Sequence, residues 1–218
     1  MVSQAGVPAT GAGEPQRRER KKRQTRDSLV HAGLALFNAK GYEHTAVREI
    51  TDAVDVSERT FFRYFASKED LALSFAKDYT DALLSELAVR PADEPPFIAL
   101  CNALHASIDV LTAEAGEAGG DTLYLPIMKL IDATPSLLAA YLRYMHDRDD
   151  EIARVLAERE GVDPAADVRP RCTAAVFSSL IVTANREWRT EGGTVEAMLA
   201  AFDACAGQVA DSLSGHWS

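Results

Sequence analysis

The segment Ser57–Leu71 constrains the fold most, because a short helix within it must serve two different surfaces. Phe61 and Phe65 lie four residues apart, so both would point from one face of the helix into a core. The other face would carry polar side chains rich in hydrogen-bond donors, namely Glu58, Arg59, Thr60 and Arg63. An exposed face of this kind, next to a tight turn and another short helix, suits the major groove of DNA.

The length and composition are those of a globular chain that needs no membrane. The 218 residues fit one large domain or two small ones, and 47% of them are hydrophobic. No uninterrupted apolar run is long enough to span a bilayer. The first residues also lack the charged-then-apolar order of a signal peptide. We therefore expect a cytoplasmic protein without a membrane partner.

The net charge of -10 is distributed unevenly along the chain. Residues 1–72 hold 12 Lys and Arg against 10 Asp and Glu, a charge of +2. Residues 73–218 hold 11 against 23, a charge of -12. The first part can therefore approach a polyanion such as DNA, whereas phosphates would repel the remainder.

Motifs of catalysis, metal binding and cofactor binding are absent from the sequence. Three widely separated cysteines form no CxxC pair, so we expect buried thiols rather than a zinc site or disulfides. The five histidines form no HExxH, and there is no GxSxG elbow, Walker loop or GxGxxG turn. We expect no enzyme, no metal and no cofactor.

Apolar residues recur at three-and-four spacing throughout, and no segment alternates with a period of two. This pattern predicts an all-α fold of about nine helices. Near the start, Gly41 is placed to end a first helix, Thr45 to cap a second, Ser57 a third and Ser67 a fourth that continues to Leu87. Helix, short helix, turn and short helix within this length is the helix-turn-helix pattern, although a purely structural three-helix unit would look similar.

Three regions follow from this pattern: 1–22 as a disordered basic arm, 23–71 as a helix-turn-helix domain, and 72–218 as a larger helical domain. The run Arg17–Arg26 holds seven basic residues and one acidic residue. It is either a solvated surface or an arm that lies along DNA phosphates.

The segment Leu29–Leu71 resembles the TetR family of one-component transcriptional regulators. The matching residues include Leu36-Phe37, Gly41-Tyr42, Thr45, Val47, Ile50, Val56-Ser57, Thr60, Tyr64-Phe65, Lys68-Glu69 and Leu71. Three positions depart from the family pattern. Asp55 replaces a turn glycine, Phe62 replaces a tyrosine, and Gly33 stands where alanine is usual.

The resemblance implies specific contacts with a palindromic operator in double-stranded DNA. Thr45, Tyr64 and Lys68 would contact phosphates and position the protein. The groove-facing set Glu58, Arg59, Thr60 and Arg63 would contact base edges, where an arginine can bind guanine O6 and N7 together.

The resemblance also implies that the second domain dimerises and receives a small effector. Helices about 171–190 and 194–213 would form the seam of a homodimer through Phe177, Ile181, Ala184, Phe202 and Val209; the alternative is that these residues pack inside their own subunit. An apolar effector pocket would be lined by Cys101, Leu104, His105, Leu125, Met128, Tyr141, Met145 and Phe177, each of which is otherwise an ordinary core residue.

Together these features predict a sequence-specific DNA-binding regulator, a repressor that an apolar effector releases from its operator. The alternative is an all-helical interaction protein, or a DNA-binding protein that responds to no effector.

Overall fold

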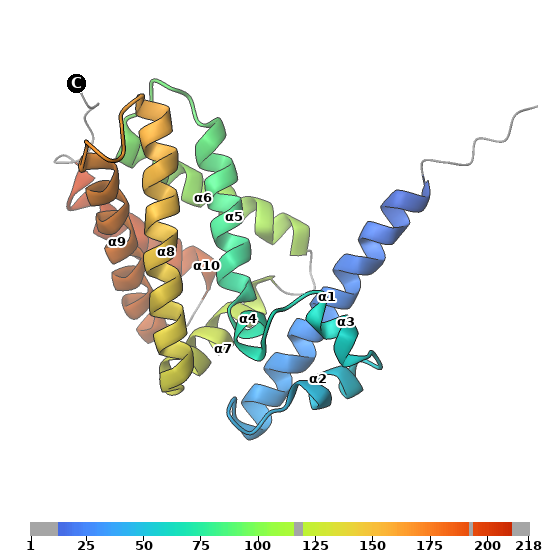
Figure 1. The fold of residues 1–218 in the computed structure, drawn as a ribbon. Helices are drawn as coiled ribbons and strands as arrows, with labels where there is room; N and C mark the ends of the chain where they lie inside the picture. Colours follow the sequence, from blue (N-terminus) through green and yellow to red (C-terminus); the bar gives the residue numbers. More distant parts are fainter. Residues whose placement is uncertain (1–12, 116–119, 192–193, 211–218) are drawn as a thin grey trace, which may run out of the picture. The chain divides into compact units, whose positions relative to one another are not determined.

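Helices account for the regular structure of the part of the chain that the structure describes, which comprises residues 13–115, 120–191 and 194–210. The structure describes the side-chain surroundings of residues 17–111, 126–187 and 194–210. The computed structural model holds ten helices in these ranges and no strand (Figure 1). The predicted all-α fold is confirmed. In the same ranges, no helix combines the length and apolar character needed to cross a membrane.

The chain divides into two compact units between Ala72 and Leu73. The first contains α1 (Gly13–Lys40), α2 (Val47–Ala53), α3 (Glu58–Phe62) and α4 (Lys68–Ala72). Its core is made by apolar side chains from all four helices and the segment after α3: Leu29, Leu34, Phe37, Ile50, Phe61, Phe65 and Leu71.

Gly33 allows α1 to pack closely against α4. A Cβ atom at this position would lie 2.7 Å from Cδ2 of the buried Leu71 and 3.6 Å from Cδ1 of Ile50. A larger residue would therefore have to displace the Leu71 side chain within a packed core. The cost of that displacement offsets the gain in helix propensity that replacing glycine would bring.

Local signals set the ends of the short helices. Gly41, with φ of 89°, follows the last residue of α1, and Asp55 takes φ of 55° in the turn between α2 and α3. The Oγ of Ser57 accepts from Thr60 N–H at 3.1 Å, and the Oγ of Ser67 accepts from Asp70 N–H at 3.0 Å. The predicted turn and both serine caps are confirmed.

The predicted cap at Thr45 is wrong, because α2 begins one residue later. The capping position belongs to Ala46, whose methyl group accepts no hydrogen bond. The Glu49 carboxylate instead accepts from Ala46 N–H at 2.8 Å. The carboxylate from within the helix thus satisfies one of the free N–H groups at its start.

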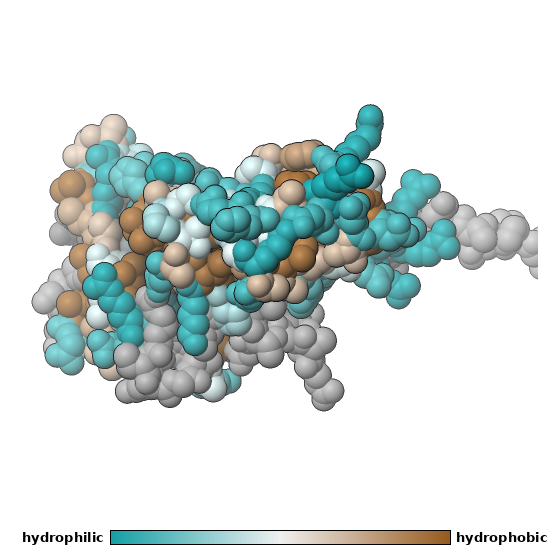
Figure 2. All heavy atoms as spheres, turned by 90° about the horizontal axis from the view of Figure 1, so that it is seen from below, coloured by the Kyte–Doolittle hydropathy of each residue, from teal (hydrophilic) through white to brown (hydrophobic). Residues whose placement is uncertain are grey.

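The predicted disorder over residues 1–22 is wrong from Gly13 on, because α1 begins there and runs unbroken through the basic run. Residues 1–12 lie outside the described part. The side chains of residues 17–24 are exposed, and Figure 2 shows hydrophilic atoms over this end of the protein, next to the grey N-terminal residues. Straight-chain Arg, Lys, Glu and Gln sustain a helix well even without a packed face.

The second unit contains α5 (Ser74–Val89), α6 (Pro96–Ala115), α7 (Gly120–Ala133), α8 (Pro135–Glu160), α9 (Arg169–Glu191) and α10 (Val195–Gly207). The fourth helix was expected to continue to Leu87, but the helix breaks at Leu73 and α5 is separate. Helix α9 packs between α8 and α10, and α5 packs along α6 (Figure 1). Their shared core includes Leu87, Phe97, Leu100, Ile152, Phe177 and Phe202.

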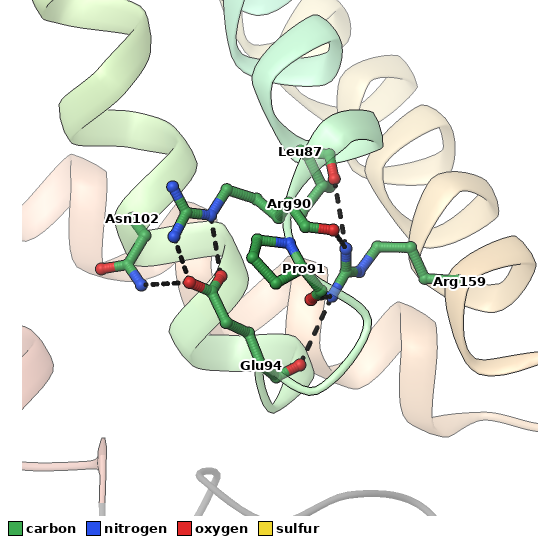
Figure 3. Close-up of polar contacts among 6 residues, drawn as sticks. All are labelled: Leu87, Arg90, Pro91, Glu94, Asn102 and Arg159. Carbon is green, nitrogen blue, oxygen red and sulfur yellow. Dashed lines mark hydrogen bonds and ion pairs between the residues drawn. The ribbon is translucent and has the colours of Figure 1, made fainter.

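Arg159 on α8 forms hydrogen bonds with the loop between α5 and α6 (Figure 3). Its guanidinium donates to the carbonyl oxygens of Arg90 and Pro91 at 2.8 and 3.0 Å, and more weakly to those of Leu87 and Glu94. Within the loop, Arg90 forms an ion pair with Glu94, which also accepts from Asn102 at 3.2 Å. The last carbonyls of α5 therefore have donors although the helix ends there.

We expect Asp55→Gly to raise the free energy of unfolding by about 0.5 kcal/mol and Asp55→Val to lower it by about 1–2 kcal/mol. Glycine adopts a positive φ without steric cost, whereas a β-branched side chain does not. Chemical denaturation followed by circular dichroism measures both changes. Asp52→Val, at a nearby exposed position in helix α2, is the matched control. Equal losses for the two valine variants would show that the backbone conformation is not the cause.

Candidate functional site

Helix α3 presents the polar face that the sequence predicted. Phe61 and Phe65 are buried with their ring centroids 5.5 Å apart, which anchors one side of the helix in the core of the first unit. On the other side, Glu58, Arg59 and Arg63 are exposed. The helix is therefore held by its aromatic side and leaves the Arg59 and Arg63 side chains exposed.

The remaining polar residues near α3 are already ordered by short contacts. Thr60 is half-buried, and its Oγ1 lies 3.0 Å from the Oγ of Ser57. The Arg63 guanidinium donates to the Tyr64 hydroxyl at 3.1 Å and lies 4.9 Å from the centre of its ring. Arg63 follows the last residue of α3, so its backbone belongs to the end of the helix rather than its middle.

Lys68 has a structural role that the sequence analysis missed. Its ammonium group donates to the carbonyl oxygens of Tyr42 and Thr45 at 2.7 and 3.0 Å and lies 4.2 Å from the centre of the Tyr42 ring. Burial, with smaller contributions from Glu69 and Glu43, raises the pKa of Tyr42 to about 12, so this partner stays neutral. Lys68 thus ties the start of α4 to the loop between α1 and α2, and only part of its donor capacity faces outward.

Thr45 does not have the exposed hydroxyl that a phosphate contact would use. The residue is 2% exposed, and its Oγ1 donates to the Gly41 carbonyl oxygen at 2.9 Å. The bond closes the loop after α1, so we remove Thr45 from the proposed phosphate contacts.

Phe62 joins this surface although the sequence analysis treated it only as a missing hydroxyl. Its side chain is 54% exposed, beside the exposed Arg63 and one turn from Arg59. The signal was present in the spacing, because Phe61 and Phe65 occupy the buried side and position 62 must then point away from it. An exposed ring there can make apolar contact with a thymine methyl group.

The second unit contains a cavity of about 60 Å³. Helices α5, α6, α8, α9 and α10 line it. It brings together four of the eight residues predicted for an effector pocket, namely Leu104, Tyr141, Met145 and Phe177. The sequence analysis missed the α5 contribution to its wall, which includes Phe75, Tyr79 and Thr80.

Three of the other four predicted pocket residues, Cys101, His105 and Met128, are not among the described residues that line this cavity. Met128 is buried elsewhere, and the side chain of Leu125 lies outside the described residues. His105 faces α10, where its Nε2 lies 2.8 Å from Oδ1 of Asp203. Cys101 is part-buried, and burial followed by the Asp203 charge raises the pKa of its thiol to about 12.

The expectation of buried cysteines is wrong for Cys172, which is exposed.

Arg148 is a lining residue that no motif predicted. Its guanidinium donates to Oγ of Ser178 on α9, and the Ser178 hydroxyl donates to Asp149. The guanidinium lies 3.7 Å from the Asp149 carboxylate. Burial is the main cause that raises the pKa of Asp149, opposed by the contacts with Ser178 and Arg148.

Four of the five residues predicted for a dimer seam lie in the interior of their own subunit. Phe177, Ile181, Ala184 and Phe202 are buried, and the rings of Phe177 and Phe202 are 5.6 Å apart. Val209 is part-buried against the same core. The four buried side chains are already covered by their own subunit, so we remove them from the predicted seam contacts, whereas Val209 keeps part of its surface accessible.

Comparisons with known proteins agree with this division into two units. Residues 29–75 match the family model "Bacterial regulatory proteins, tetR family", and residues 94–214, more than half of the chain, match "MftR C-terminal domain". The HTH-type transcriptional regulator TcmR of Streptomyces glaucescens is 41% identical over 204 residues, which cover 93% of this chain and 90% of that protein.

Two further relatives are more distant. MftR of Mycobacterium tuberculosis is 27% identical over 84% of this chain and 90% of its own length. A solved TetR-family transcriptional regulator from Agrobacterium tumefaciens is 18% identical, covers 89% of this chain and 100% of that one, and has a TM-score of 0.46. Because one family model matches the helix-turn-helix and a regulator matches nearly the whole chain, this protein belongs to the TetR family of bacterial transcriptional regulators rather than to a class of enzymes.

Proposed function

We propose that the protein is a homodimeric repressor that binds a palindromic operator and is released from it by a small apolar effector. The exposed side of α3 carries this proposal, since Arg59, Phe62 and Arg63 are presented outward while Phe61 and Phe65 hold the helix in place. Family membership supports the DNA-binding class, and the cavity in the second unit supports a ligand-responsive one.

The bases and the phosphates would be contacted by different residues. Arg59 and Arg63 would contact base edges together with Glu58 and Thr60, and Phe62 would add an apolar contact. Tyr64 and the outward part of Lys68 would contact phosphates, which position the protein without selecting a sequence. The exposed basic residues at the start of α1 would add phosphate contacts along the duplex.

Binding to DNA can be tested with a gel shift on the region upstream of the protein's own coding sequence, together with fragments selected from a random pool. We expect a palindromic site, and affinity whose logarithm falls with the logarithm of salt concentration by about 0.9 for each phosphate neutralised. Absence of binding, or binding that salt does not weaken, would favour the alternative of an all-helical interaction protein.

Arg59→Ala should cost about 1–3 kcal/mol of discrimination at one base pair in each half-site, because it removes a bidentate contact with a base edge. Binding of the variant to a panel of single-base operator mutants measures this loss. Arg59→Lys keeps the charge without the planar fork and should keep general DNA affinity while losing the preference. An unchanged preference in both variants would remove Arg59 from the contact set.

Dimerisation would use the outer faces of α9 and α10, since their inner faces are occupied by the core. Among the exposed residues there, five small ones recur at helical spacing: Ala175, Ser179 and Thr183 on α9, and Ala200 and Ala204 on α10. Small side chains allow two helix pairs to approach closely and form a four-helix bundle. A palindromic site needs two such subunits, because one recognition helix contacts one half-site.

Ser179→Arg should convert the dimer into a monomer, because a large cation would be buried without a partner at the seam. Light scattering coupled to size-exclusion chromatography measures the molar mass. Ser85→Arg, at an exposed position on α5, is the matched control and should stay dimeric. A dimer that persists with Ser179→Arg would place the seam on another face.

A further inference from the structure

Arg148 is the single charged side chain among the described residues that line the cavity of the second unit. Apart from Thr80, its neighbours in the wall are apolar or aromatic, with the rings of Phe75, Tyr79, Tyr141 and Phe177 among them. The Arg148 side chain is 9% exposed. Burying a permanently charged group in such surroundings is costly unless its donors find acceptors.

The contacts within the protein leave this requirement unmet. One terminal nitrogen of Arg148 donates to Ser178, but Nε is buried and has no hydrogen-bond partner among the described residues. Native proteins pair nearly all buried polar groups, so an orphaned donor of this kind needs an explanation. Nε of Arg159 is orphaned in the same way, but Arg148 also lines a cavity, where a ligand can reach its guanidinium through the terminal nitrogens.

A purely structural role accounts for only part of this arrangement. The bond to Ser178 joins α8 to α9, and that link needs one donor. The Asp149 carboxylate lies 3.7 Å from the same terminal nitrogen that donates to Ser178, so this ion pair also leaves Nε without a partner. Neither residue engages Nε, so the guanidinium retains capacity for a further anionic acceptor.

We propose that Arg148 binds the carboxylate, or a comparable oxyanion, of an effector whose remaining body is apolar and ring-bearing. This inference rests on the proposed function only in taking the cavity as the effector site. A planar guanidinium matches the geometry of a carboxylate, and a charge-assisted bond is favoured where water is excluded. The aromatic side chains would pack against the ring system of the same molecule.

The size of the cavity sets a second condition on the effector. A water molecule needs about 10–15 Å³ of cavity volume, so a cavity of 60 Å³ holds only a few waters. A two-ring acid must therefore displace side chains as it enters. Met145 and Met198 both line the cavity, and their unbranched thioether side chains can change conformation at small cost.

The experiment compares two probes of nearly equal shape, 2-naphthoate and its uncharged amide 2-naphthamide. Their affinities for the full-length protein are measured by isothermal titration calorimetry without DNA. We expect the wild type to bind naphthoate about ten- to a hundredfold more tightly than naphthamide, the range of a charge-assisted hydrogen bond. Arg148→Met should abolish this preference and leave the affinity for naphthamide unchanged.

Arg148→Lys keeps the positive charge without Nε and should retain only part of the preference. Thermal unfolding of each variant shows whether it is folded, and the wild-type comparison of the two probes decides the matter even if a variant is not. Equal or weaker binding of naphthoate by the wild type, no binding of either probe, or a preference that survives Arg148→Met would overturn the inference.

The outcome is separable from that of the proposed function because no DNA is present. A protein that prefers naphthoate through Arg148 but is not released from its operator would contradict effector release and leave the inference about Arg148 standing. A protein that binds its operator but shows no preference between the probes would contradict the inference about Arg148 and leave the proposed DNA binding standing.

Discussion

The burial of Phe61 and Phe65 is the constraint on which the DNA-facing surface depends. Helix α3 has only five residues and cannot be stable in isolation, so its orientation comes from these two rings in the core of the first unit. The close approach of α1 and α4 at Gly33 builds the core that receives them. Arg59, Phe62 and Arg63 face outward because the aromatic residues face inward.

Buried apolar side chains also fix the orientation of the helices in the second unit. Its core is continuous from α5 and α6 to α9 and α10, and it consumes the apolar faces that the sequence suggested for a partner subunit. One buried guanidinium interrupts this apolar interior at the cavity. An incompletely paired arginine that also lines a cavity has the arrangement expected of a ligand site, since such sites sacrifice stability for recognition.

Much of the fold could be predicted because the relevant signals are local. Ser57, Ser67, Gly41 and Asp55 act through their own backbone neighbourhood, so their positions alone predicted the caps and turns that the structure confirms. Predictions failed where a competing partner was distant or unseen. Glu49 replaced the cap expected from Thr45, and the predicted disorder ignored the helix propensity of the basic run.

The sequence by itself determined the all-α class, the helix-turn-helix and the inward and outward sides of α3, because these follow from periodicity and from residues a few positions apart. Only the tertiary structure decided which long-range partners each side chain meets. Lys68 proved to bridge two carbonyls, Phe177 and Phe202 to pack within one subunit, and Arg148 to line the cavity. Helical spacing tells which residues share a face, but what covers that face depends on how the helices pack together.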